Sequence, residues 1–130
     1  MLINGIDENF YNNIRNTILK ARKNIYKNIN FEIVKSAWDV GRQIIEEEQK
    51  GKCRADYGKQ ILKQLSERLT KEFGKGYSQT NLKNMKNFYT MFQNCQTLSD
   101  ELSWSHYIEL SKIKDETMRK FYYNECINSS

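Results

Sequence analysis

Hydrogen-bonding side chains without negative charge are concentrated in residues 79–90. This stretch contains no Asp or Glu, although the chain of 130 residues has 16 acidic residues in all. Asn and Gln can pair with adenine through two hydrogen bonds, and Lys can reach guanine or a phosphate. These residue types predict contact with nucleic-acid bases by four side chains, which are Gln79, Thr80, Lys83 and Asn84.

Other cationic and amide side chains nearby could hold the phosphate backbone. Contacts to phosphates fix the register of a protein on a duplex but carry no sequence information. We predict phosphate contacts for Lys59, Lys71, Lys75 and Lys86, and we place Asn87 on the same outer face as Lys83.

The charge distribution is uneven along the chain. Residues 50–86 contain ten Lys or Arg and three Asp or Glu, which gives 10 − 3 = +7, whereas the whole chain carries +5, so the remainder sums to −2. A basic centre between neutral or acidic ends suits a phosphate-facing surface, because backbone contacts dominate nucleic-acid affinity. A solvated, lysine-rich helix face would have the same composition. Charge alone leaves both interpretations open.

Catalytic and metal-binding interpretations have less support. His106 is the only histidine, so a packed or surface histidine is favoured over a general base. The three glutamates at 46–48 occupy consecutive helical positions, point in different directions and indicate a solvated helix end. The three cysteines are widely spaced and indicate neither a disulfide framework nor a zinc site. We therefore expect no catalytic residue, no metal and no cofactor, and a chain that is not an enzyme.

The elements that would position these side chains are helices. The chain has no proline and only six glycines, and apolar residues recur every three or four positions, which predicts an all-α fold. We expect a single-domain helical bundle over residues 1–130. Its long first helix should cover 10–49, with a bend or break near 28–31, where the apolar phase shifts.

Residues 57–93 have the sequence form of a helix-turn-helix. We expect a helix at 57–73, a glycine-containing turn, and a helix capped by Ser78. The inward positions of the first of these helices should be Tyr57, Ile61, Leu62, Leu65, Leu69 and Phe73. In such a motif the first helix braces against the phosphate backbone while the second enters the major groove. An ordinary helical hairpin with a solvated outer face is the alternative.

Two short helices should close the chain, the second capped by Asp115. The aromatic residues of the C-terminal half could stack on bases, but their helical spacing indicates that most are core, with Tyr77 and Tyr123 as the expected exceptions. The aromatic segments 102–107 and 118–123 would also suit a protein interface.

Five motifs occur in the order expected of a known family. They are WDVGRQIIEEEQ at 38–49, RADYGK at 54–59, LSERL at 65–69, FGKGYS at 73–78 and LSWSHY at 102–107. Over about residues 10–128 the chain resembles the N-terminal domain of the bacterial YhcG-like family of PD-(D/E)XK nucleases. The resemblance implies a helix-turn-helix-like domain that normally precedes a nuclease domain. We expect this chain to lack that second domain, so catalysis is not carried over.

Two functions follow as expectations. The first is a module that recognises nucleic acid, DNA before RNA, either excised from a longer protein or standing alone. The second is a protein-interaction module of a mobile element or defence system that inhibits or adapts a nuclease complex. We also expect a possible homodimer through the long first helix, a cytoplasmic location and no membrane partner, because no run of 18 apolar residues occurs.

Overall fold

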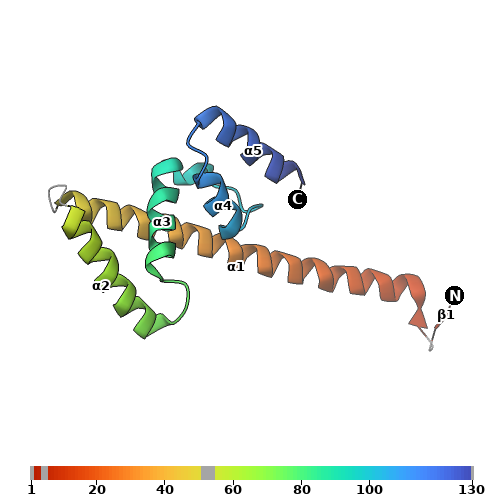
Figure 1. Ribbon diagram of the computed structural model, residues 1–130. Coiled ribbons are helices and arrows are strands. Elements are labelled where there is room, and N and C mark those ends of the chain that lie inside the picture. Colours follow the sequence, from red (N-terminus) through yellow and green to blue (C-terminus); the bar gives the residue numbers. More distant parts are fainter. Residues whose placement is uncertain (1, 4–5, 51–54, 130) are drawn as a thin grey trace.

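One helix of the protein is much longer than the others, and the shorter helices lie along part of its length (Figure 1). The structure is a computed structural model that describes all residues except 1, 4–5, 51–54 and 130. Two strands of two residues each, β1 (Leu2–Ile3) and β2 (Ile6–Asp7), pair antiparallel at the N-terminal end. The remaining elements are α1 (Glu8–Lys50), α2 (Ala55–Phe73), α3 (Gln79–Met91), the 3₁₀ turn η1 (Cys95–Thr97), α4 (Trp104–Ser111) and α5 (Glu116–Ser129). The all-α prediction is confirmed.

The first helix is not interrupted where the sequence predicted a bend or break. α1 is helical without a gap through residues 28–31. Ile33 is 48% exposed and Val34 is fully buried, and adjacent residues of an α-helix lie about 100° apart around its axis. The shift in apolar phase therefore marks a change in the face that α1 uses, and the prediction of a break was wrong.

The core lies where α3 crosses the second half of α1. α1 contributes Val34, Ala37 and Ile44, and Gly41 faces the backbone of α3 at Met85. From α3, Leu82, Met85 and Phe88 are buried, and α4 adds Tyr107 and Leu110. This packing fixes which face of α3 remains outside.

Tyr107 anchors the aromatic part of the core. Its ring packs against Phe88, with centroids 4.9 Å apart, and against Phe92 at 5.3 Å. Its hydroxyl accepts a hydrogen bond from the Ser99 amide at 2.8 Å. Burial raises the pKa of Tyr107 well above its ordinary value, so this side chain is neutral and acts in packing.

α2 packs less deeply than predicted. Leu62 is buried, and Leu65 and Leu69 are partly buried against the core, as expected. Phe73, also expected inside, is 63% exposed, because the helix ends at this residue and the chain turns away at Gly74. The helix also begins at Ala55, so Asp56 lies inside its first turn.

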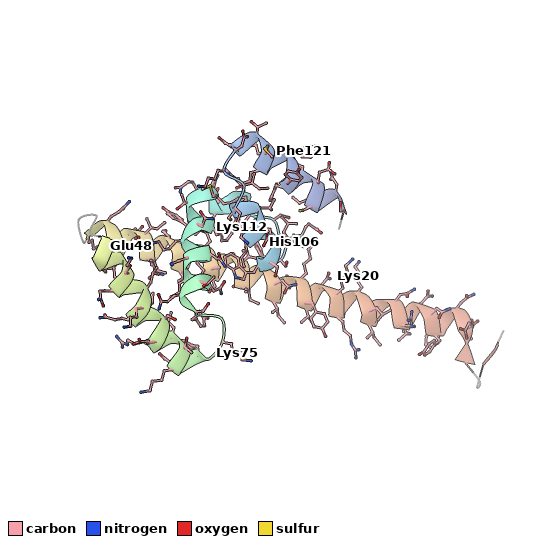
Figure 2. All side chains as sticks on the ribbon, in the orientation of Figure 1. Lys20, Glu48, Lys75, His106, Lys112 and Phe121 are labelled. Atoms are coloured by element: carbon pink, nitrogen blue, oxygen red, sulfur yellow. The ribbon has the colours of Figure 1, made fainter. Side chains whose placement is uncertain are left out.

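The C-terminal helix exposes different aromatics from those predicted. Asp115 caps it as expected, since its Oδ1 accepts a hydrogen bond from the Met118 amide at 3.0 Å. Tyr123, expected outside, packs partly buried against the core and donates a hydroxyl hydrogen bond to the Thr97 carbonyl at 3.1 Å. Phe121 and Tyr122 are exposed instead, and Figure 2 shows Phe121 on the side of α5 away from α1. Tyr123 and Ile127 lie four residues apart on one face, and that face is the one that α5 buries.

Within the described part of the chain, no helix is both long enough and apolar enough to span a bilayer.

Candidate nucleic-acid interface

The N-terminal half of α3 presents a polar face to solvent. Ser78 caps this helix in an extended conformation, and its hydroxyl accepts a hydrogen bond from the Asn81 amide at 3.1 Å. Because Leu82, Met85 and Phe88 are buried, the opposite side of the helix must point outward. Three of the predicted base readers are exposed on it: Gln79, Thr80 and Lys83.

The C-terminal half of the same face is tied into the fold. Lys86, a predicted phosphate contact, forms an ion pair with Glu48 of α1 at 2.5 Å. Asn87 donates an amide hydrogen bond to the Ser111 carbonyl of α4 at 3.0 Å. Asn84 between them is half-buried. The structure therefore gives Lys86 and Asn87 partners within the chain, whereas no partner is recorded for the Lys83 side chain among the described residues.

The remaining predicted cations approach α3 from the turn and from α2. Lys75 is exposed in the turn, three residues before the Ser78 cap, and Figure 2 shows it there. Lys71 is exposed in the last turn of α2, close to the same turn. Lys59 is also exposed, but it lies twelve residues, or about 18 Å of helix, farther along α2 from Lys71. The structure groups Lys71 and Lys75 with the start of α3 and leaves Lys59 apart.

The turn between α2 and α3 is held by hydrogen bonds. Gly74 and Gly76 have φ values of 85° and 108°, which residues other than glycine rarely adopt. The Ser66 hydroxyl donates to the Tyr77 carbonyl at 2.7 Å, and the side-chain amide of Asn81 donates to the Gly76 carbonyl at 2.6 Å. These bonds link the turn to both helices and set the position of Lys75 relative to Gln79.

One cation beside this face was not found from the sequence. Lys112 follows α4 directly, is exposed and pairs with Glu109 at 3.0 Å. The Asn87 bond to Ser111 brings this end of α4 to α3 across 24 residues of sequence. A contact between segments so far apart leaves no signal in local spacing, which explains the omission.

A groove of about 740 Å³, which was not predicted from the sequence, lies between α1 and the α2–α3 turn, and Lys75 is one of its lining residues. Its walls come from the middle of α1, from the turn and from α3 and α4. Two of the lining residues are hydrogen-bonded to each other, since the Trp104 indole donates to the Asn81 side-chain oxygen at 3.3 Å. Most of the lining is apolar, with Ile29, Ile33, Tyr77, Met85 and Trp104.

The residues considered for catalysis have structural partners. His106 closes a capping box at the start of α4, where its Nδ1 accepts a hydrogen bond from the Ser103 amide at 3.1 Å. Glu46 pairs with Arg42 at 3.0 Å, and Glu48 pairs with Lys86. Cys53 lies outside the described residues. No cluster of His, Cys, Asp and Glu suited to a metal occurs among the described side chains.

Comparison with known proteins places the chain in a family. The model of the DUF1016 N-terminal domain matches residues 13–130. The Escherichia coli (strain K12) protein named "Putative nuclease YhcG" is 34% identical over 99 residues, which cover 74% of this chain and 26% of that protein. The chain thus spans about a quarter of the length of this relative. No solved structure matches the chain. The protein belongs to the DUF1016 N-terminal domain family.

Proposed function

We propose that the protein is a recognition module that binds nucleic acid, with DNA as the preferred ligand over RNA. In this module α2 and α3 act as a helix-turn-helix. The observation that carries the proposal is the exposed, acid-free face formed by Gln79, Thr80 and Lys83 at the start of α3. Hydrogen-bonding side chains at this place in a second helix are those that reach base edges in the major groove. The similarity to a protein named as a nuclease supports a role on nucleic acid.

The geometry ranks the candidate contacts. Gln79, Thr80 and Lys83 are the base readers, and Lys71 and Lys75 beside them contact phosphates. Lys59 reaches a more distant phosphate. Asn84 has a lesser part because it is half-buried. Lys86 and Asn87 lie on the same face of α3 and hold this helix against α1 and α4. We assign no catalytic role to any described residue.

Charge reversal at Lys83 tests this proposal. We expect Lys83→Glu to weaken binding of a labelled duplex by about tenfold or more at low salt, because one good base contact is worth roughly 1–3 kcal/mol. Fluorescence anisotropy with duplex DNA, duplex RNA and single strands measures the affinity. The wild-type affinity should also fall steeply as salt rises.

The matched control is Lys120→Glu, which changes the net charge equally on the exposed surface of α5. It should alter affinity by less than about twofold, as expected for a charge outside the contact. The proposal fails if the wild type binds no nucleic acid at low salt, or if both variants weaken binding equally.

A second function is favoured by a separate observation on α5. Phe121 and Tyr122 are exposed with ring centroids 5.3 Å apart, beside exposed Met118. Exposed aromatics and Met are typical of protein interfaces, which supports a module that binds a partner such as a nuclease. Binding of such a partner should survive Lys83→Glu and high salt but be lost on Phe121→Asp. The opposite pattern would assign the binding to nucleic acid.

A further inference from the structure

The first part of α1 carries an apolar stripe that faces solvent. In Figure 1 this part of the helix extends away from the other helices. The spacing of the stripe residues, four or seven positions apart, keeps them on one side of a helix. We define the α1 stripe as six of the exposed apolar residues of α1, each between 47% and 60% exposed: Phe10, Ile14, Ile18, Ile25, Ile29 and Ile33. Tyr11, Leu19 and Tyr26 of the same helix are also exposed and are not counted in it.

The spacing of the six α1 stripe residues is the same from either end of the stripe. Intervals of four, four, seven, four and four residues are symmetric about the point between Ala21 and Arg22. A contact between two copies with two-fold symmetry uses the same patch on both, so residue i meets residue j and j meets i. If two α1 helices run antiparallel across this point, Ile18 faces Ile25 of the second copy. Ile14 then faces its Ile29.

The groove continues the line of the α1 stripe. Ile29 and Ile33 belong to both, and Ser36 and Ala37 extend the groove along α1. In the antiparallel arrangement Phe10 of the second copy faces Ile33, at the entrance of a groove lined by Tyr77, Met85 and Trp104. The groove has space for an aromatic side chain, since its volume is about 740 Å³.

The contact area is sufficient for association. Residues 10–33 span about 35 Å of helix, and a stripe that covers a third of the circumference exposes roughly 500 Å² per copy. Two copies would bury about 1,000 Å² before the groove contact is added, and specific interfaces begin at about 1,200 Å². Filling the groove with the Phe10 side chain brings the total into that range.

Most charged residues of α1 lie off the α1 stripe, but Glu32 and Arg22 lie on its side of the helix, about 40° and 120° around the axis from Phe10. Glu32 lines the groove and pairs with Lys35 at 2.8 Å. Lys27 lies away from the α1 stripe and pairs with Glu101 at 2.7 Å and Asp100 at 3.6 Å. Lys20 lies two positions beyond Ile18, about 200° around the helix axis. Arg22 lies beside the symmetry point, where two copies would bring like charges together. Salt would screen this repulsion and would not dissolve an apolar contact.

We infer that two copies of the chain associate through the α1 stripe as an antiparallel pair, with Phe10 of each entering the groove of the other. This inference does not depend on the proposed nucleic-acid binding. The occupant is a second copy because the spacing is symmetric and the groove lies in line with it.

Sedimentation velocity over a range of protein concentrations tests the association. The wild type should shift from the 15.5 kDa monomer towards twice that mass, and the shift should persist or increase at higher salt. Ile18→Asp should remain monomeric at every concentration, and its helix content by circular dichroism should match that of the wild type in dilute solution, where both are monomeric. Lys20→Asp on the opposite face is the matched control and should still associate.

Disulfide trapping tests the orientation. In a variant without native cysteines, a mixture of Ile14→Cys and Ile29→Cys chains should form mixed disulfide dimers on oxidation, and Ile14→Cys alone should not. Crosslinking of Ile14→Cys alone would indicate a parallel pair and would overturn the antiparallel arrangement. A wild type that stays monomeric up to its solubility limit, or an Ile18→Asp variant that associates like the wild type, would overturn the inference.

Discussion

Gly41 decides how closely α1 and α3 can approach. A Cβ at this position would overlap the Met85 carbonyl oxygen of α3, and that oxygen belongs to the backbone and cannot turn aside. The residue is fully surrounded in the core, next to buried Ala37 and Ile44. A residue without a side chain is therefore required here for packing, and its backbone conformation is that of an ordinary helix.

Two glycine substitutions separate this packing effect from helix propensity. Gly41→Ala should destabilise the protein by about 1–3 kcal/mol, the usual cost of overpacking a core. Gly58→Ala in α2 should stabilise it by about 0.5–1 kcal/mol, because the new Cβ would meet only the Glu48 side chain, 3.6 Å away at the nearest. Urea unfolding followed by circular dichroism measures both. Equal destabilisation by the two changes would contradict the role given to Gly41.

At the scale of single residues, the sequence predicted the outward face of α3 but not the state of each residue on it. Gln79, Thr80 and Lys83 are exposed as helical spacing requires. Lys86 lies on the same face by spacing, yet it pairs with Glu48, a residue 38 positions earlier. Such a pairing depends on how α1 and α3 cross, and no local pattern encodes that crossing.

Among the elements, α1 combines two environments in one helix. From Val34 onward one face of the helix packs in the core, whereas residues 9–26 are all exposed. Most helical stability in proteins comes from tertiary packing, which this exposed part of α1 lacks. The first half of α1 therefore depends on what covers its apolar stripe.

Amide hydrogen exchange should reveal this difference within α1. At low protein concentration we expect residues 9–26 to exchange much faster than residues 34–48, because local opening of an uncovered helix costs little free energy. Raising the protein concentration should slow exchange in residues 9–26 only, since association covers the α1 stripe. Uniform protection along α1 in dilute solution would contradict this expectation.

The sequence predicted the order and type of the helices well, and their faces less well. Strong amphipathic patterns placed α2 and α3 within a few residues of their observed bounds. In α5 apolar residues occur on more than one side, so Phe121 and Tyr122 could not be told from Tyr123 by spacing. In α1 the change of buried face after Ile33 looked like a break, because sequence periodicity shows only that the apolar direction changes.

For the whole molecule, the position of α3 along α1 determines how far apart the two reading faces would lie in a dimer. Gly41 is about 20 residues, or roughly 29 Å, from the symmetry point near Ala21, so the two crossings lie about 58 Å apart. Successive major grooves on one side of B-DNA are only about 34 Å apart. Because a separation of about 58 Å is not a multiple of this spacing, we expect each duplex site to engage one copy. Hydroxyl-radical footprinting should then show a single protected segment and not the two protected segments of a palindrome. The length of a single uninterrupted helix would thus determine which spacings between DNA sites a dimer can occupy.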